Sequence, residues 1–402
     1  MPEAPRRRPA LPGIVKSLGL VSLLNDLASE MMYPLLPALV EGLGGGALAL
    51  GTLDGVAEAV SALFKLVAGR LADRPGWRRP LVVVGYAIAA VARPLMGVAG
   101  VAWQVIGLRA VDRVGKGART PPRDAVLADA TDPTIRGRAF GFHRMMDHAG
   151  AMLGPLVAFA LLAGLTMRPA EVILWSAVPG LAAVLVVSYA MRRIRPGSPL
   201  AAEPAAEAPS EVASTDDSSR PMRAAIVLVV LFAAARLPET LMLLRLQGLG
   251  VPLTLLPIVW ALLHAVRTGA SYPGGWLSDR AGPLATMLIG WALYACVAVG
   301  LAIAAGPWTA VLWFMLFGLV AGATESPERA LIAAWGRRRE RGTKFGIYHA
   351  SVGLVALPGG IALGALYQWV GAPAAFGASA GAAALLTLVG LALRPVAGLT
   401  AR

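Results

Sequence analysis

The sequence is poor in the residues on which many enzymes and disulfide-bonded proteins depend. It has one cysteine and four histidines in 402 residues. The single thiol, Cys296, lies inside an apolar run, so neither a disulfide framework nor a cysteine metal site is available. A Walker phosphate loop and an H-E-x-x-H zinc pair are also missing. These absences argue against an enzyme, and we expect no cofactor and no bound metal.

Charge is scarce as well, because charged residues make up 15% of the chain while 57% is hydrophobic. A soluble domain of ordinary composition carries more charge than this. Apolar runs long enough to cross about 30 Å of hydrocarbon recur from Ile14 to Leu393, and we count twelve of them. No large soluble domain fits between these runs. The expected fold class is an all-α membrane protein with twelve transmembrane helices in contact with membrane lipid.

Lysine and arginine are distributed unevenly between the loops. The net charge of +13 could suggest a nucleic-acid partner, but the placement of the charges argues against one. The basic residues cluster in alternate loops: Arg6 to Arg8; Arg70, Arg74, Arg78 and Arg79; Arg136 and Arg138; Arg192, Arg193 and Arg195; Arg337 to Arg341 and Lys344. By the positive-inside rule, both termini are cytoplasmic in a multi-pass protein of a bacterial inner membrane.

A polar segment divides the apolar runs into two sets of six. Residues 197–221 are rich in proline, alanine, serine and acids and cannot bury a core, which indicates a flexible linker. The expected organisation is a cytoplasmic tail (1–13), a six-helix bundle (14–192), a cytoplasmic linker (193–221), a second six-helix bundle (222–394) and a cytoplasmic tail (395–402).

The two sets of runs share an internal repeat. ARTPPRDAVL at 118–127 aligns with ATESPERALI at 323–332, and RGRAFG at 136–141 aligns with RGTKFG at 341–346, both at an offset of 205 residues. GRLADR at 69–74 aligns with GWLSDR at 275–280, one residue further. We infer a duplicated six-helix unit, and two such halves around a central site are typical of transporters.

The first repeated loop carries a family resemblance. GRLADRPGWRRPL at 69–81 and its echo GGWLSDRAGP at 274–283 resemble the loop signature of the major facilitator superfamily. The resemblance implies a twelve-helix transporter in which this loop latches one conformation, with Asp73 as the latch residue. A merely topogenic loop would explain the arginines but not Gly69 and Asp73. The residues expected to act in gating here are Gly69, Asp73, Arg74, Gly275, Asp279 and Arg280.

A second stretch resembles the fifth-span antiporter motif of the same family. HAGAMLGPLVAF at 148–159 matches through Gly150, Gly154 and Pro155, and departs from the motif at Ala158 and Phe159. Small residues four apart form a flat helix face, and a proline allows a kink. The resemblance implies a hinge or seal associated with antiport. Ordinary close helix packing remains the alternative.

The predicted fourth span is unusually charged. RAVDRVGKGARTPPRDA at 109–125 places Arg109, Arg113 and Lys116 on one helical face, and Asp112 is spaced to pair with Lys116. In the family this helix faces the central cavity, so the resemblance implies cavity charges. We expect the helix to end at TPPRD, residues 120–124, because proline interrupts a regular helix.

Ionisable residues also occur in other predicted spans. Charges inside the hydrocarbon layer are costly and usually functional. As a set, they predict a wet binding site with a proton or ion relay, although a static salt-bridge lattice remains the alternative for any single residue. The further candidates are Asp26, Glu30, Asp54, Glu58, Arg144, Asp147, His148, Arg236, Glu239, His264 and Arg267.

These features together favour a secondary transporter. We expect proton-coupled antiport that exports a small-molecule substrate, with protons as the coupling partner and a monomer as the working unit. A symporter or exchanger of an organic anion is the alternative within the class, favoured by the cationic face on the fourth span. A membrane-embedded enzyme and a signalling scaffold are the alternatives from other classes, and a bare scaffold has no need of charges inside the membrane.

Overall fold

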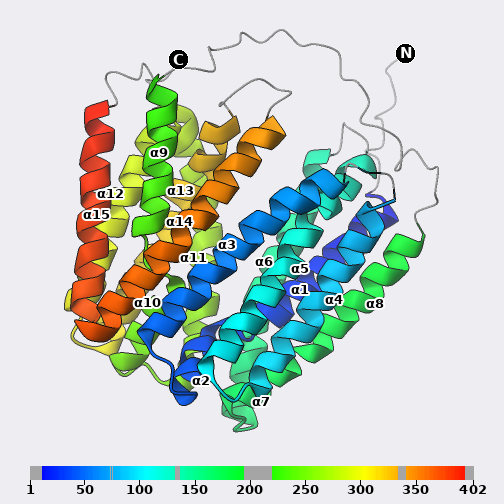
Figure 1. The fold of residues 1–402 in the computed structure, drawn as a ribbon, viewed down its shortest axis with the longest axis horizontal. Coiled ribbons are helices and arrows are strands. Elements are labelled where there is room, and N and C mark those ends of the chain that lie inside the picture. The colour runs from blue at the N-terminus through cyan, green and yellow to red at the C-terminus, as the bar shows by residue number, and fades with distance from the viewer. Residues whose placement is uncertain are drawn as a thin grey trace, which may run out of the picture.

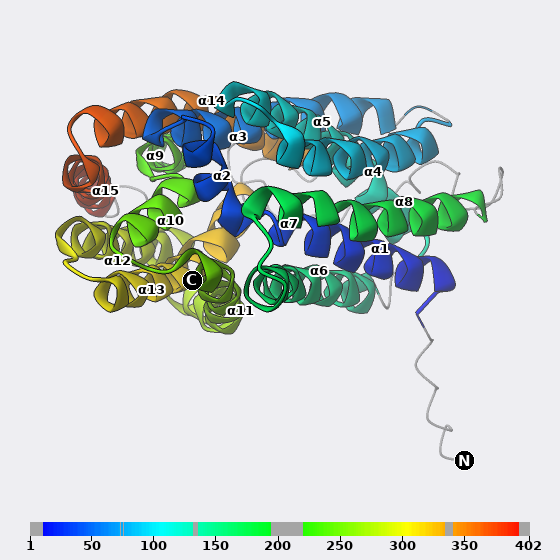
Figure 2. The ribbon, with the colours of Figure 1, turned by 90° about the horizontal axis from the view of Figure 1, so that it is seen from below.

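The computed structural model describes residues 11–72, 74, 76–131, 136–193, 220–333 and 341–393, which form helices and no strand (Figure 1). Asp73, most of the 193–221 linker and nearly all of both tails lie outside the described residues, together with the sequence predictions made for them. The helices of residues 13–192 and those of residues 220–393 occupy opposite sides of the molecule (Figure 2). These ranges are called the amino-terminal and carboxy-terminal halves below.

The amino-terminal half contains the elements α1 (Gly13–Glu30), η1 (Tyr33–Leu35), α2 (Leu36–Gly42), α3 (Ala47–Ala72), α4 (Arg78–Leu95), η2 (Met96–Val98), α5 (Ala102–Asp129), α6 (Arg136–Phe159), η4 (Ala160–Gly164), α7 (Pro169–Trp175) and α8 (Ala177–Arg192). The carboxy-terminal half contains α9 (Arg220–Ala235), α10 (Glu239–Gly248), η6 (Leu253–Leu255), α11 (Leu256–Ala281), α12 (Pro283–Ile303), α13 (Pro307–Ala333), α14 (Arg341–Trp369) and α15 (Ala372–Leu393).

Ten helical spans in the described ranges are long and apolar enough to cross a membrane. The other two positions of the predicted twelve belong to α1 with α2, and to α5. Both are polar: α1 carries Asn25, Asp26 and Glu30, and α5 carries the charged run that begins at Arg109. A helix enclosed by other helices can cross a membrane without an apolar surface, because its charges face protein rather than lipid. The structure is therefore consistent with twelve spans.

Among the described residues, the two halves meet closely at one end only. Along α3 and α14 the backbones touch through glycines: a Cβ added to Gly55 would lie 2.8 Å from Leu357 Cα, and one added to Gly364 would lie 2.6 Å from the carbonyl oxygen of Ala47. The side-chain oxygen of Gln368 accepts a hydrogen bond from the backbone N–H of Leu48 at 3.0 Å. Small residues permit this approach. We call this end the closed end.

At the other end the same two helices diverge (Figure 1). The contact between them extends as far as Gly353, where an added Cβ would meet Ala62 and the carbonyl oxygen of Glu58. This end carries the arginines of the helix termini Arg70, Arg78 and Arg192, and we call it the basic end. The molecule is therefore open toward the basic end and shut at the closed end.

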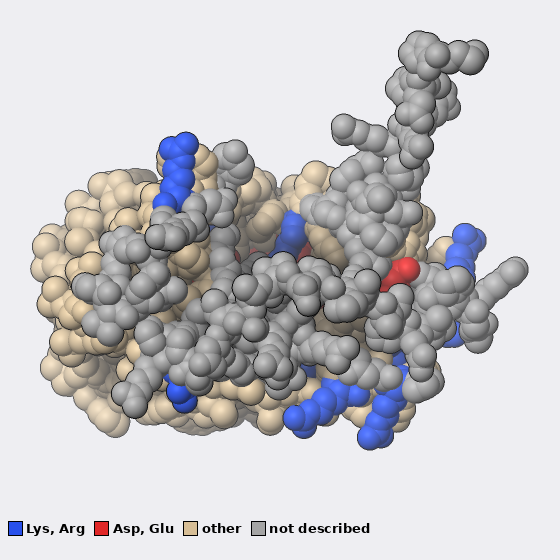
Figure 3. Space-filling model, turned by 90° about the horizontal axis from the view of Figure 1, so that it is seen from above, with Lys and Arg blue, Asp and Glu red and all other residues tan. Residues whose placement is uncertain are grey.

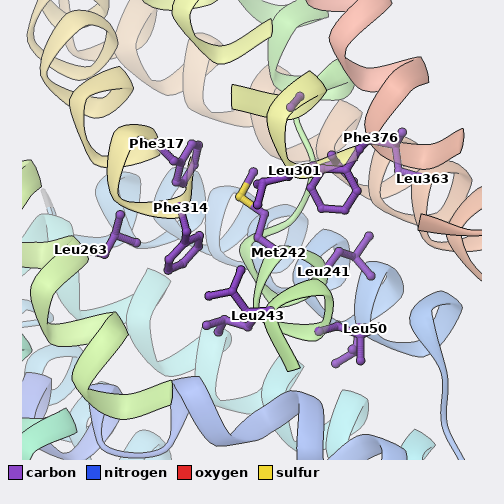
Figure 4. Packing of buried hydrophobic residues seen from close by; sticks show 14 of the residues in the cluster. Leu50, Leu241, Met242, Leu243, Leu263, Leu301, Phe314, Phe317, Leu363 and Phe376 are labelled. Atoms are coloured by element: carbon purple, nitrogen blue, oxygen red, sulfur yellow. The ribbon is translucent and has the colours of Figure 1, made fainter. Parts of the chain in front are cut away.

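The short helix α10 fills the space between the halves near the closed end. Its residues Met242 and Leu243 are fully buried, and Figure 4 shows them between Phe314 of α13 and Leu50 of α3. Inside a membrane the hydrophobic effect does not drive helix association, so this interdigitation contributes mainly through van der Waals contact. The buried cluster spans both halves and holds them in register at this end.

Helix α5 does not end where the sequence predicts. It continues through Pro121 and Pro122 to Asp129, so the expected stop at TPPRD is wrong. Prolines are tolerated inside membrane helices when neighbouring groups satisfy the freed backbone and hold the helix in place. Here packing against α4 holds the helix in place: Arg119 donates to the carbonyl oxygen of Gly85 on α4 at 3.2 Å.

Candidate functional site

The centre of α5 holds a buried ionic cluster. Asp112 is fully buried, and its carboxylate meets Nε of Arg93 at 2.8 Å, NH1 of Arg109 at 3.3 Å and Nε of Arg113 at 3.6 Å. The predicted Asp112–Lys116 pair is therefore replaced by pairs with three arginines. A carboxylate removed from water needs such compensation, and the arginine on α4 supplies the shortest contact.

Two members of this cluster were missed by sequence reasoning. Arg93 donates to the backbone oxygen of Asn25 at 2.8 Å and to its side-chain oxygen at 3.1 Å, and Arg119 donates to the same side-chain oxygen at 3.1 Å. Arg93 and Arg119 are almost completely buried. The cluster thereby joins α1, α4 and α5. A lone arginine inside an apolar run, as at Arg93, was the one available signal.

The ionic cluster changes the expected role of the α5 cations. Arg109 is 1% exposed and Arg113 is 8% exposed, so neither presents an open cationic face to a cavity. Arg109 also lies over the ring of Tyr33, 5.2 Å from its centroid. Lys116, one turn further along α5, keeps an exposed side chain.

Glu30 forms one contact between the two halves. At the end of α1, it accepts a hydrogen bond from Nε1 of Trp260 at 2.9 Å, and Nε2 of His264 lies 3.6 Å from the same carboxylate oxygen. Trp260 and His264 belong to α11. The indole ring also lies against Tyr33, with ring centroids 4.8 Å apart. An acid of the amino-terminal half thus accepts a hydrogen bond from one residue of the carboxy-terminal half and lies near an ionisable ring of the same half.

Asp54 on α3 makes a second contact of the same kind. Its carboxylate accepts hydrogen bonds from Tyr33 OH at 3.1 Å and from the hydroxyl and backbone N–H of Thr240 at 2.8 Å and 3.3 Å. Thr240 lies on α10, in the carboxy-terminal half, and is fully buried. The residues Glu30, Tyr33, Asp54, Thr240, Trp260 and His264 are called the inter-half site below.

An ion pair within the carboxy-terminal half borders this site. NH2 of Arg267 contacts a carboxylate oxygen of Glu239 at 2.6 Å, and its guanidinium lies 5.8 Å and 5.3 Å from the ring centroids of Trp260 and Phe317. Seen from the basic end, basic and acidic atoms are visible deep between the halves (Figure 3). The open side of the molecule therefore leads toward ionisable groups.

The fifth-span motif lies where α6 packs against α1. A Cβ on Gly150 would lie 3.1 Å from Cβ of Asp26, and one on Gly154 would lie 2.6 Å from the carbonyl oxygen of Leu27. On the same helix, the carboxylate of Asp147 accepts a hydrogen bond from the hydroxyl of Ser22 on α1. The motif glycines thus bring α6 against the polar face of α1.

The remaining predicted residues are not gathered into either site. The side chains of Glu58, Arg144, His148 and Arg236 are exposed. Arg144 reaches Asp147 at 3.8 Å. Across the described residues, no group of three or more histidine, cysteine, aspartate or glutamate side chains is arranged to hold a metal ion.

The loop-signature glycines Gly69 and Gly275 lie in open surroundings. Cβ atoms on Gly69 and Gly275 would meet nothing within 4 Å, whereas one on Gly274 would overlap the backbone of Gly322. Arg74 is exposed, Arg280 lies over the ring of Trp276 at 4.0 Å, and the side chains of Asp73 and Asp279 are outside the described set.

Comparison with known proteins agrees with this architecture. The family profile described as Major Facilitator Superfamily matches residues 18–327 and 269–400. An uncharacterized MFS-type transporter of Methanocaldococcus jannaschii is 26% identical over 357 residues, covering 87% of each chain. The multidrug resistance protein MdtH of Yersinia pestis is 33% identical over 159 residues, covering 38% of this chain and 39% of the relative.

The fold has counterparts among solved structures. The crystal structure of the nucleoside transporter NupG superposes with a TM-score of 0.77 at 13% identity, covering 95% of this chain and 99% of NupG. At this identity the likeness concerns the fold alone. With the profile match across both halves, it confirms the expected all-α, multi-pass membrane architecture. The chain belongs to the Major Facilitator Superfamily, whose members are transporters of small molecules rather than enzymes.

Proposed function

We propose that this protein is a proton-coupled transporter that exports a small solute by alternating access between its two halves. The observation that carries the proposal is the inter-half site. Two carboxylates of the amino-terminal half, Glu30 and Asp54, accept hydrogen bonds from Trp260 and Thr240 of the carboxy-terminal half. Contact between the halves therefore depends on groups that can bind a proton.

Protonation weakens these particular contacts. A carboxylate accepts hydrogen bonds through both oxygens, and charge-assisted bonds are about twice as strong as neutral ones. A protonated Asp54 becomes a donor at one oxygen and loses its charge, so it binds the hydroxyl and N–H of Thr240 less well. A proton that binds preferentially in one conformation shifts the equilibrium toward that conformation, and by linkage the conformation sets proton affinity. This is the coupling required for secondary transport.

The direction of transport is proposed as export. Part of the chain is similar to a multidrug resistance protein, and the partial antiporter motif lies at the α1–α6 contact. The alternative, a symporter or exchanger of an organic anion, drew its support from the cationic face of α5. In the structure Arg109 and Arg113 are buried against Asp112, which leaves this alternative with less support.

The membrane orientation belongs to the same proposal. We assign the basic end to the cytoplasm, because basic loops remain on that side of a membrane. Residues 14–192 and 222–394 would then move as two units in a monomeric protein of the bacterial inner membrane. A reporter fused after Gly44 or Gly306 should report the periplasm, and one within the 197–221 linker the cytoplasm. Reversed signals would contradict the orientation.

Transport in proteoliposomes tests the function directly. Purified protein is reconstituted with an internal pH-sensitive dye, and ethidium, as a lipophilic cation, is compared with a panel of anionic metabolites. Proton movement that depends on one of these solutes is the expected result. Asp54→Asn should reduce that flux at least tenfold, while Glu171→Gln, a change remote from the inter-half site, leaves it unchanged. Solute flux with no proton movement would refute the coupling.

A further inference from the structure

We infer that Asp26 of α1 and Asp147 of α6 share a proton, so that the contact between these helices is a second proton site, apart from the inter-half site. The residues Ser22, Asp26, His143 and Asp147 are called the α1–α6 seam. The inference deepens the proposed function, on which its role in coupling rests. The shared proton itself is a property of the seam that is measurable without any transported solute.

The packing of α6 against α1 brings the two acids together. The backbone of Gly150 lies directly on Asp26, since a Cβ at that position would be 3.1 Å from Asp26 Cβ. Asp147 precedes Gly150 by three residues and therefore lies on the same face of α6. The hydroxyl of Ser22, one turn before Asp26 on α1, donates a hydrogen bond to the carboxylate of Asp147, so the two acids lie beside the same stretch of α1. Two like charges at such proximity repel, and one shared proton relieves the repulsion.

A buried histidine points to the same conclusion independently. His143 is 3% exposed, and its Nδ1 lies 3.5 Å from a carboxylate oxygen of Asp147. Its other ring nitrogen, Nε2, is buried and makes no hydrogen bond to any described residue. A buried polar atom without a partner is costly, so an imidazole kept in this position calls for an explanation. A neutral imidazole can carry its proton on either nitrogen, which suits a group that exchanges a proton with Asp147.

Among the described residues, neutral side chains donate the hydrogen bonds to these two carboxylates. Ser22 donates to Asp147, and Asn25 donates to Asp26 at 2.8 Å. Arg144 approaches Asp147 at 3.8 Å but is mostly exposed, with 59% of its side chain accessible. The other charged or titratable groups that face the seam are Glu30 of α1, Lys116 and Arg123 of α5, His148 of α6 and, through His148, His264 of α11. No arginine whose side chain the structure describes lies as close to either acid as Arg93 lies to Asp112.

The seam leads toward the inter-half site. Ser22, Asp26 and Glu30 recur every four residues, on one face of α1, so successive groups are about 6 Å apart along the helix axis. The end of this stripe, Glu30, contacts Trp260 and His264 of the other half. Protons that enter from the open basic end can therefore pass from Asp147 to Asp26 and on to Glu30, each step transferring a proton from a carboxylic acid to a neighbouring carboxylate.

A titration of the purified full-length protein tests the shared proton. Infrared difference spectra of the carboxyl stretch are recorded across a pH series in detergent, without solute. Asp147→Asn keeps the shape of the side chain and removes its charge. It should lower the pH midpoint of Asp26 by about one unit, a tenfold change in its acid dissociation constant, because the repulsion is gone. Asp26→Asn should do the same for Asp147, and Asp129→Asn, at the basic end, should change neither.

Failure of the shared proton and failure of the proposed function would give different results. If each single variant leaves the midpoint of the other acid unchanged, the two acids do not share a proton. Ser22→Ala provides a second test if Asp147→Asn fails to fold: loss of the hydroxyl donor should raise the midpoint of Asp147, and an unchanged midpoint overturns the seam. If the pH midpoints of Asp26 and Asp147 are coupled but no solute moves protons, the shared proton is supported and the proposed function is refuted. Solute-driven proton movement with independent midpoints would refute the seam alone.

Discussion

Helices α5 and α13 occupy equivalent positions in the two halves, yet their interiors differ in chemistry. At the offset of 205 residues that relates the repeats, Arg109, Asp112 and Arg113 correspond to Phe314, Phe317 and Gly318. The centre of the amino-terminal half is filled by an ionic cluster. The centre of the carboxy-terminal half is filled by aromatic rings, and the ring centroids of Phe314 and Phe317 are 6.3 Å apart. A packed interior must be filled to normal density, and any buried charge in it must be paired. The ionic cluster and the aromatic rings both meet these requirements.

The glycines explain why both solutions fit the same backbone. Gly85 allows α4 to approach α5 at Arg119, and Gly290, 205 residues later, allows α12 to approach α13 at Thr324. The duplicated glycines maintain the helix spacing, so the side chains between them were free to diverge. The inter-half site takes its two acids, Glu30 and Asp54, from the amino-terminal half and receives hydrogen bonds from Trp260 and Thr240 of the carboxy-terminal half.

Removal of Asp112, the central acid of α5, should have the largest effect on the stability of the folded protein. Asp112→Ala leaves Arg93, Arg109 and Arg113 buried with no carboxylate, and such uncompensated charge costs about 3 to 5 kcal/mol. We expect loss of the folded protein or a large drop in its unfolding temperature in detergent. The matched change Phe317→Leu, at the equivalent position, conserves most of the volume and should cost less than about 1.5 kcal/mol. Equal losses would show that the ionic cluster is no more critical than the aromatic one.

The second prediction concerns the contact between α3 and α14 at the closed end. Gly51→Ala places a methyl group on the backbone of Gly360 across the α3–α14 contact, and we expect the closed end to open. Such overpacking costs about 1 to 3 kcal/mol. Alkylation of a cysteine introduced as Gln368→Cys, in a Cys296→Ala background, measures the opening and should become faster. Gly69→Ala, which meets open space, is the control, and faster alkylation in that control would contradict the assignment.

The contact of Asp54 with Thr240 should show a comparable effect in which the two residues are coupled. Hydrogen bonds to a charged group contribute about 1.5 to 3 kcal/mol, so Asp54→Asn and Thr240→Val should each lower the free energy of unfolding by an amount within that range. If the two side chains act through one contact, the double variant should lose less than the sum of the single losses. Strict additivity would indicate that the halves are not joined here.

The smallest effect is expected at an exposed pair. Arg168 contacts Glu171 at 2.8 Å at the start of α7, and 81% of the arginine side chain is accessible. Exposed ion pairs contribute about 0 to 1 kcal/mol, so Glu171→Gln should leave the unfolding temperature nearly unchanged. A loss as large as that of Asp112→Ala would mean that burial does not govern the energetics of these pairs.

Sequence reasoning succeeded where local pattern and repetition carry the information. The family, the all-α membrane fold and its transporter class are confirmed, because apolar runs of bilayer length and a duplicated loop signature leave few other architectures. It failed where a neighbouring helix decides the outcome. Pro121 and Pro122 predict a helix end from the local backbone alone, but the packed bundle carries α5 past them to Asp129.

The sequence by itself determined which residues are ionisable, on which helix each lies and which positions are small enough for close contact, since these follow from residue type and helical period. Only the tertiary structure decided which charges meet. Asp112 pairs with Arg93 on another helix rather than with Lys116 on its own, and α6 packs directly on Asp26 because Gly150 has no side chain. A helix fixes the direction of a side chain about its own axis, but the partner is set by the rotation and depth at which two helices pack.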